Sequence, residues 1–224
     1  MSRKRLIRSI STISIIYLIV QSMIIYFDDT DLSRSLWLEH KNVKELIKAG
    51  TPERSSITPI AKAISNQHFW ILRFYLLITI ILTFYYRQKD IEKYTRYKCF
   101  TLSVIIILIA VSGVLTWSLK ILVGKPRPFT NLTEHIPFAL SMKYHSFPSG
   151  HTTETFSYII PYIYYRNNKY LISIVFFCGI LISFLRIILS YHYITDVIFG
   201  IYLTSLFGYI ICYLCEKRIK THFS

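Results

Sequence analysis

The chain has 224 residues and is both strongly apolar and strongly basic, which limits the kind of protein it can be. Hydrophobic residues make up 53% of the sequence, charged residues only 17%, and the mean hydropathy is +0.41. So few charged side chains cannot solvate a soluble globule of this size, and the composition therefore predicts a membrane protein. The formal net charge of +14 is compatible with nucleic-acid binding, but no soluble module with a basic, aromatic-lined face accompanies it. We expect no nucleic-acid partner and interpret the basic residues as determinants of membrane topology.

Six apolar segments approach the length that crosses a bilayer as a helix, which is about 20 residues. They are residues 7–27, 69–86, 99–119, 152–165, 171–189 and 193–215. The fourth is short and contains Pro161; it is included because residues 156–165 are apolar and an even number of crossings fits the charge distribution. We predict an all-α, polytopic membrane protein in which six transmembrane helices form one bundle, and a single domain over residues 1–224.

Lysine and arginine are concentrated in alternate connections between the predicted spans, which the positive-inside rule places in the cytoplasm. These basic residues are Arg3, Lys4, Arg5, Arg8, Arg87, Lys89, Lys93, Arg96, Lys98, Arg166, Lys169, Lys217, Arg218 and Lys220. Both termini are therefore predicted to be cytoplasmic, with residues 28–68, residues 120–151 and the turn near Tyr191 outside. The first apolar run has no small-x-small cleavage site after Val20, so we interpret it as a retained anchor.

The predicted outer segment, residues 28–68, has acidic residues that balance its bases and apolar residues at near-helical spacing. We expect it to be extracytoplasmic and to lie on the membrane surface. A plain connecting helix and a role in admitting lipid substrate are both compatible with this pattern.

Four cysteines, Cys99, Cys178, Cys212 and Cys215, fall within apolar runs. Cys212 and Cys215 have C-x-x-C spacing, which in other settings marks a redox or metal site. No further ligands accompany them here, so we interpret all four as packing residues. We predict neither a metal site nor a cofactor.

Three polar clusters stand where the apolar pattern predicts none, and all three fall on the predicted outer side. The first runs from Lys120 to Pro128 at the outer end of the third span. Gly124, Pro126 and Pro128 end the helix and let the chain fold back, so that Lys120 and Arg127 can converge on an anion. Taken alone, the same residues are also compatible with a snorkelling lysine and a solvated arginine.

The second cluster is Pro148-Ser149-Gly150-His151, at the start of the fourth span. A Ser-Gly turn that runs into a helix offers backbone N–H groups at the positive end of the helix dipole, which suits a phosphate. His151 stands beside this turn. A helix N-cap followed by a histidine would have the same sequence. Glu154, one turn further on, either complements the dipole or makes a polar contact.

The third cluster lies at the junction of the fifth and sixth spans and contains Arg186, His192 and Asp196. An arginine within an apolar run is costly in lipid, so Arg186 should face a polar interior and meet an anion. His192 and Asp196 are four residues apart, which on a helix places them on one face within about 6 Å. A carboxylate at that place can fix the imidazole tautomer and leave the other ring nitrogen free to attack. A buried structural His–Asp pair would have the same spacing.

Taken together, the clusters place three cations, a backbone N–H nest and two histidines in one outward cavity. This combination matches phosphoryl transfer, in which catalysis consists mainly of positioning and of neutralising the phosphoryl oxygens. Three clusters on one predicted side of the membrane support this interpretation more strongly than any one of them.

These residues resemble the type 2 phosphatidic acid phosphatase superfamily, whose pattern is K-x6-R-P, then P-S-G-H, then S-R-x5-H-x3-D. The resemblance implies a six-span membrane bundle with its site on the outer side. One departure is visible: Leu185 stands where the family usually has serine, so one phosphate hydrogen bond is in doubt. The matching residues are Lys120, Arg127 and Pro128, then Pro148, Ser149, Gly150 and His151, then Arg186, His192 and Asp196.

The resemblance also implies a two-step, metal-independent mechanism. His192 is the nucleophile that forms a phosphohistidine, Asp196 orients it, and His151 is the general acid that protonates the leaving group. Water then releases phosphate. The residues that the resemblance implies for binding the phosphoryl oxygens are Lys120, Arg127, Ser149, Gly150 and Arg186.

We therefore expect an integral-membrane lipid phosphatase that hydrolyses a phosphomonoester or diphosphate, such as isoprenyl diphosphate, phosphatidylglycerol phosphate, phosphatidic acid or a lipid A phosphate. One alternative is a phosphotransferase that passes the phosphoryl group to another lipid. Another is a noncatalytic lipid-phosphate transporter or binding protein, which the intact His151, His192 and Asp196 argue against, since binding needs no nucleophile. The high content of isoleucine, tyrosine and lysine and the short chain are typical of a bacterial protein. We therefore expect it in the inner membrane, with the site facing the periplasm.

Overall fold

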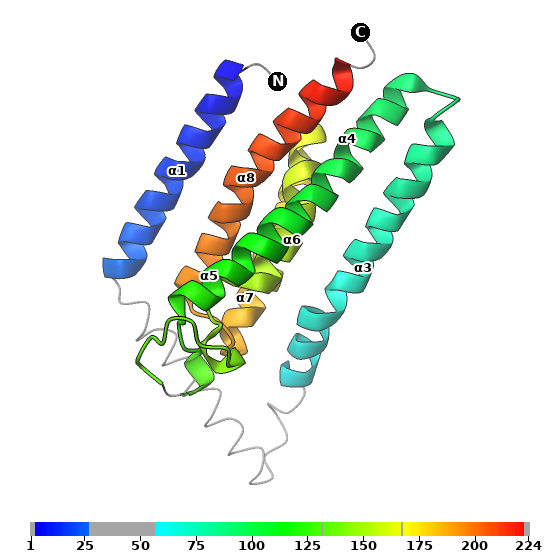
Figure 1. The fold of residues 1–224 in the computed structure, drawn as a ribbon. Helices are drawn as coiled ribbons and strands as arrows, with labels where there is room; N and C mark the ends of the chain where they lie inside the picture. Colours follow the sequence, from blue (N-terminus) through cyan, green and yellow to red (C-terminus); the bar gives the residue numbers. More distant parts are fainter. Residues whose placement is uncertain (1–2, 27–56, 131, 167, 222–224) are drawn as a thin grey trace.

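A computed structural model describes residues 3–26, 57–130, 132–166 and 168–221. Most of the predicted outer segment, residues 28–68, therefore lies outside the described residues. The part that is described contains helices and no strand, which confirms the all-α prediction (Figure 1). Its helices are α1 (Arg3–Tyr26), α3 (Ile57–Tyr86), α4 (Ile91–Ile107), η1 (Leu108–Leu115), α5 (Thr116–Val123), η2 (Pro128–Thr130), η3 (Met142–Tyr144), α6 (Gly150–Tyr165), α7 (Lys169–Ile188) and α8 (Ile194–Lys220).

The long helices lie side by side and run in alternating directions (Figure 1). α8 packs against α1, α4 and α6, and α6 also packs against α4 and α7. Both chain ends and the α3–α4 and α6–α7 connections lie at one end of the bundle. The loop between α5 and α6 and the junction of α7 and α8 lie at the opposite end, where the three polar clusters of the sequence are found.

Four stretches are long and apolar enough to cross a membrane: Phe69–Tyr86, Ile91–Thr130, Lys169–Ile188 and Ile194–Ile219. They confirm the prediction of a polytopic membrane protein. α1 contributes the shorter apolar stretch Leu6–Ser22, and α6 has only 16 residues. The count of six crossings and the cytoplasmic placement of both termini stay predictions.

α6 differs from the other long helices because it is enclosed by them. Between Thr152 and Pro161 its side chains are buried, with Glu154 the one exception. A helix that faces other helices can carry hydroxyl side chains that bond across the interface, as Thr153 does with Ser112 at 3.3 Å and with Thr116 at 3.4 Å. This is the physical reason that the fourth segment is short and only partly apolar in sequence.

α4, η1 and α5 form one continuous helical column in which η1 is a π-helix. The hydroxyl of Thr116 donates to the Val111 carbonyl, five residues earlier, at 2.8 Å. Cys212 of α8 is fully buried in the apolar cluster beside this column, together with Ile107 and Val111. The prediction that Cys212 is a packing residue is thereby confirmed.

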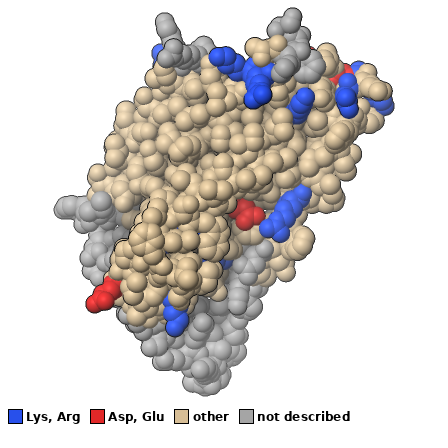
Figure 2. All heavy atoms as spheres, viewed as in Figure 1, with Lys and Arg blue, Asp and Glu red and all other residues tan. Residues whose placement is uncertain are grey.

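Basic side chains gather at the end of the bundle that holds both termini, while the flank between the two ends is largely uncharged (Figure 2). The described basic residues of the α3–α4 connection and its flanks, Arg87, Lys89, Lys93 and Arg96, are exposed there. A flank with few charged side chains and a basic end is what the positive-inside rule leads us to expect of a bundle embedded in a bilayer.

Candidate active site

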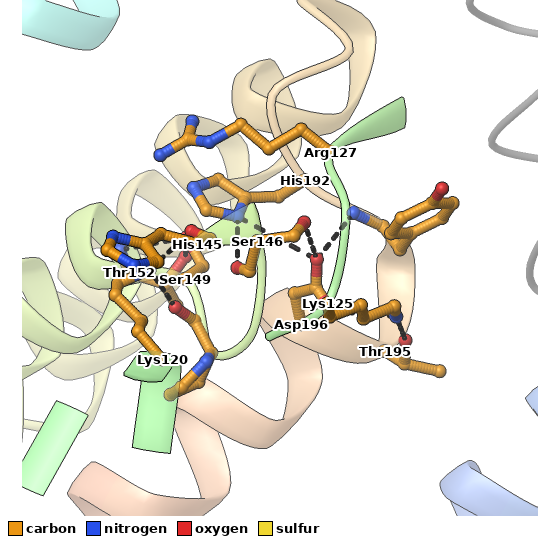
Figure 3. A network of polar contacts seen from close by, with 12 residues as sticks. Lys120, Lys125, Arg127, His145, Ser146, Ser149, Thr152, His192, Thr195 and Asp196 are labelled. Atoms are coloured by element: carbon orange, nitrogen blue, oxygen red, sulfur yellow. Dashed lines mark hydrogen bonds and ion pairs between the residues drawn. The ribbon is translucent and has the colours of Figure 1, made fainter. Parts of the chain in front are cut away.

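The three polar clusters meet at the end of the bundle that is opposite the termini. Lys120 lies in the last turn of α5, Ser149 caps the N-terminus of α6, and Asp196 lies in the first turn of α8. The backbone N–H of Ser149 donates to the Asp196 carbonyl at 3.0 Å, which joins the second cluster to the third. Figure 3 shows these side chains around a single centre.

Gly124 makes the chain reversal that brings the first cluster to this centre. It ends α5 with φ of 56°, in the left-handed region that favours glycine, and its N–H donates to the Lys120 carbonyl. A Cβ at this position would overlap the backbone of Ile136, which itself donates to the Gly124 carbonyl at 3.0 Å. The turn then leads into Lys125 and Arg127, as the sequence predicted for a helix that ends at Gly124.

Lys120 is buried, and its ammonium bonds to the loop before α6. Nζ donates to the carbonyl of His145 at 2.9 Å and to that of Pro148 at 2.6 Å. These two bonds fix the loop beside α5 and place a cation against the N-terminus of α6. A snorkelling lysine that reaches solvent is therefore wrong for Lys120, whose ammonium instead joins the first cluster to the loop before the second. Convergence of Lys120 with Arg127 on an anion stays a prediction.

Ser149 organises the N-terminus of α6 through its side chain. Its Oγ accepts from the Thr152 hydroxyl at 2.9 Å and from the Thr152 N–H at 3.5 Å, as an N-cap does. Gly200 of α8 approaches so closely that a Cβ there would lie 3.3 Å from the Ser149 carbonyl. Because the Ser149 amide is bonded to Asp196, the expectation that this particular N–H faces a phosphate is wrong.

His192 is buried and held by a backbone carbonyl. Its Nδ1 lies 2.7 Å from the Ser146 carbonyl oxygen, and a carbonyl can only accept, so Nδ1 carries the proton. Nε2 then has the free electron pair. In Figure 3, Nε2 points away from this carbonyl, on the side of the Arg127 guanidinium.

Asp196 stands behind His192 without a direct hydrogen bond to it. Its Oδ2 lies 3.7 Å from His192 Nδ1, whereas the same oxygen accepts from the Ser146 hydroxyl at 2.5 Å and from the Tyr193 N–H at 2.9 Å. α8 begins only at Ile194, so His192 precedes the helix. The prediction that the pair shares a helical face is therefore wrong, although the two groups are close.

The surroundings of His192 disfavour its protonated form. Burial lowers the pKa of His192 to about 3, the positive charges of Lys120 and Arg127 act in the same direction, and Asp196 acts against them. The imidazole is thus neutral at physiological pH, which is the state in which Nε2 can act as a nucleophile.

The two arginines are anchored in different ways. Arg127 donates from Nε to the Met142 carbonyl at 3.0 Å and is partly buried, so it is more than a freely solvated arginine. Arg186, at the end of α7, is 4% exposed, and its guanidinium lies 4.4 Å from the centroid of the Tyr191 ring. Its backbone carbonyl accepts from the amides of Tyr191 and His192, which fixes the loop that carries His192.

His151 lies one residue after Gly150, in the first turn of α6, and its ring contacts Phe69 of α3 with 5.0 Å between the ring centroids. One turn further on, Glu154 forms an ion pair with Arg73 of α3 at 3.3 Å. Of the two roles left open for Glu154, the polar contact is therefore the one that the structure contains. Leu185, the one departure from the pattern that the sequence resembles, is partly buried in α7.

Two residues of this centre were missed by sequence reasoning, Ser146 and Lys125. Ser146 is fully buried and contacts both His192 and Asp196, and Lys125 donates to Asp196 Oδ1 at 2.8 Å. Lys125 lies inside the first predicted cluster without an assigned role, and Ser146 lies two residues before the second. Their contacts join positions 46 to 71 residues apart in the chain, so no local pattern could reveal them.

Among the residues that the structure describes, no group of three histidine, cysteine, aspartate or glutamate side chains is arranged to hold a metal ion. Comparison with known families gives one match: residues 99–220, more than half of the chain, match the model of the PAP2 superfamily. The match includes every residue of the three clusters. No curated protein and no solved structure matches the chain.

Proposed function

Because the chain belongs to the PAP2 superfamily, whose members are generally phosphatases, we propose that it hydrolyses the phosphate of a membrane lipid through a phosphohistidine intermediate. His192 is the nucleophile, Asp196 orients it, and His151 is the general acid. Lys120, Arg127 and Arg186 supply positive charge for the phosphoryl oxygens, together with the N-terminus of α6.

The observation that carries this proposal is the orientation of the His192 ring. Nδ1–H is committed to the Ser146 carbonyl at 2.7 Å, so the lone pair is on Nε2, and burial keeps the ring neutral. A histidine that served only as a structural hydrogen-bond partner would not need a neutral ring with a free electron pair close to the positive charges of Lys120 and Arg127. A nucleophile does.

In the first chemical step, Nε2 of His192 forms a bond to phosphorus while the bond from phosphorus to the lipid oxygen breaks. His151 gives its proton to that oxygen, and the positive charge that develops on the imidazole is balanced by Asp196. In the second step, water attacks phosphorus and gives a proton to His151, which restores the acid, while the P–N bond breaks and inorganic phosphate leaves. The cations around the site stabilise the charge on the phosphoryl oxygens in both steps.

The membrane setting supports a lipid as substrate. The clusters lie at the end of an apolar bundle, opposite the end where basic side chains gather, so a phosphate at the level of the lipid headgroups could reach them. We place this end on the extracytoplasmic side, which in a bacterium is the periplasmic face of the inner membrane.

The experiment that tests the reaction is phosphate release by the purified protein in detergent with a chelator present. The substrates are phosphatidic acid, phosphatidylglycerol phosphate, an isoprenyl diphosphate and a lipid A phosphate. We expect release from at least one lipid, abolished in His192→Ala and kept in His135→Ala, which changes an exposed histidine of the outer loop. Full activity of His192→Ala would refute the histidine mechanism.

The intermediate and the general acid can be tested separately. Rapid quenching with radiolabelled lipid phosphate should trap label on the protein that is stable in alkali and lost in acid, as a P–N bond is. His151→Ala should lose activity toward a lipid phosphate but keep most of it toward p-nitrophenyl phosphate, whose leaving group needs no proton. Equal loss toward both substrates would contradict the role of His151 as acid.

The orientation predicts which residues an impermeant reagent can reach. In a chain whose native cysteines are replaced by alanine, Glu134→Cys should react with a membrane-impermeant maleimide in intact cells. Asn168→Cys, in the α6–α7 connection, should react only after the membrane is opened. The opposite pattern would refute the orientation.

A further inference from the structure

Lys125 is a cation of the site that faces the carboxylate and lies outside the motif residues. Its Nζ donates to Asp196 Oδ1 at 2.8 Å and to the Thr195 hydroxyl at 3.0 Å, and it lies 4.2 Å from the centroid of the Tyr193 ring (Figure 3). The Lys125 side chain is 14% exposed and that of Asp196 is fully buried. The ammonium is therefore held in place by a carboxylate, a hydroxyl and an aromatic face.

The two oxygens of Asp196 have separate partners. Oδ1 accepts from Lys125, whereas Oδ2 accepts from the Ser146 hydroxyl and the Tyr193 N–H and is the oxygen near His192. A carboxylate held at both oxygens cannot rotate. Lys125 therefore helps to fix the orientation of the carboxylate beside the imidazole, although it does not touch the imidazole itself.

Lys125 also contacts Ser146 through the backbone, because its carbonyl accepts from the Ser146 N–H at 3.0 Å. Ser146 in turn presents its own carbonyl to His192 Nδ1 and its hydroxyl to Asp196. The four residues form a closed ring of contacts, in which Lys125 provides one cation and one backbone acceptor. A substitution that removes the Lys125 ammonium leaves its backbone carbonyl, and so the bond from the Ser146 N–H, intact.

We propose that Lys125 is a positioning residue for phosphoryl transfer, which holds the Asp196 carboxylate in register with Ser146 and His192. The inference rests on the proposed function. When the P–N bond forms, positive charge develops on the imidazole, and a correctly oriented carboxylate stabilises it. Without the ammonium, Oδ1 loses this donor and the carboxylate can rotate away from its position beside the imidazole. The step that forms the phosphohistidine then slows.

The test compares Lys125→Met and Lys125→Arg with Lys143→Met, which changes an exposed lysine in the same loop. The substrate is the lipid phosphate that the wild-type protein hydrolyses fastest, and inhibition by orthovanadate reports on phosphate binding. We expect Lys125→Met to lower kcat by roughly 10- to 100-fold, by analogy with the loss of an outer-shell partner that orients a metal-binding histidine. KM and vanadate inhibition should stay unchanged, Lys125→Arg should recover most of kcat, and Lys143→Met should match the wild type.

A double-mutant cycle with Asp196→Asn separates positioning from loss of folding. If Lys125 acts through the carboxylate, Lys125→Met should cause no further loss of kcat in the Asp196→Asn background. An equal loss in both backgrounds would overturn the proposal, because it would identify a general effect on folding.

Two other results would also decide against the inference. Lys125→Met with the kcat of Lys143→Met would show that the ammonium has no part in positioning. A raised KM and weakened vanadate inhibition at unchanged kcat would show that Lys125 binds phosphate. Failure of the proposed function is distinct from both, since the wild type would then release no phosphate or His192→Ala would keep full activity.

Discussion

Acid should destabilise this protein through His192, because the folded state keeps the ring neutral. Burial lowers the pKa of His192 to about 3, against an ordinary value of 6.5 in the unfolded chain. Between these two values the unfolded state binds more protons than the folded state. The free energy of unfolding is therefore not reduced by His192 above pH 6.5. As the pH falls from 6.5 toward 3, protonation of His192 in the unfolded chain progressively lowers it.

The size of the effect follows from the linkage between proton binding and folding. Within this window each pH unit removes about 1.4 kcal/mol, so a fall from pH 7 to pH 5 removes about 2 kcal/mol. The comparison variant is His192→Gln, which keeps a polar side chain of similar size but has no titrating group. Every other ionisable group is common to the two proteins, so the difference between them isolates His192.

The assay is denaturant or thermal unfolding in one detergent at pH 7 and pH 5, for both proteins. The wild type should lose about 2 kcal/mol more than His192→Gln between the two pH values. The same pH dependence in both proteins would refute the reasoning, since it would mean that His192 is protonated as readily in the folded state as in the unfolded chain.

Two further substitutions test how the site is built. Ser146→Ala removes the hydroxyl that donates to Asp196 at 2.5 Å, and it should lower the free energy of unfolding by about 2 kcal/mol, as expected for a bond to a charged group. Ser157→Ala removes a buried hydroxyl that donates to a neutral carbonyl. It should lower the free energy of unfolding by about half as much in the same measurement. Gly124→Ala places a Cβ at a φ of 56° and against a loop carbonyl, so it should cost about 2 kcal/mol or more and reduce phosphate release. Gly113→Ala within η1, where a Cβ would lie 3.3 Å from the Leu108 carbonyl, should cost less and leave phosphate release nearly unchanged. Equal melting temperatures for Gly124→Ala and Gly113→Ala would contradict the role assigned to the turn.

Helix positions were largely predictable from the sequence, because a span must satisfy its backbone internally and present apolar side chains to lipid. The predicted segments 7–27 and 171–189 correspond closely to α1 (Arg3–Tyr26) and α7 (Lys169–Ile188). The segment 69–86 covers only the second part of α3, which begins at Ile57. Apolar length predicts the part of a helix that needs lipid, and a helix can continue beyond it through more polar residues.

α6 shows the opposite limit of sequence reasoning. Its side chains face other helices, so apolarity was not required of it, and the segment could be included only through the charge pattern and its short apolar run. Its buried hydroxyls, such as Thr153, have partners on η1 and α5. The partners of such residues are decided by packing between helices, which leaves no periodic signal in the sequence.

The residue types of the site and their order were determined by the sequence itself. Cations within or beside apolar segments are costly unless they meet an anion. Here they occur together with a helix N-terminus and a His–Asp pair, and this combination pointed to a phosphate. What the tertiary structure alone decided is how His192 is held: by the Ser146 carbonyl, with Asp196 behind it and Lys125 on the other carboxylate oxygen. These contacts depend on where a loop between α5 and α6 crosses the start of α8. Hydrogen bonds between residues so far apart in the chain arise only when helices bring them together. The sequence could therefore predict which residues carry the chemistry but not the contacts that hold them.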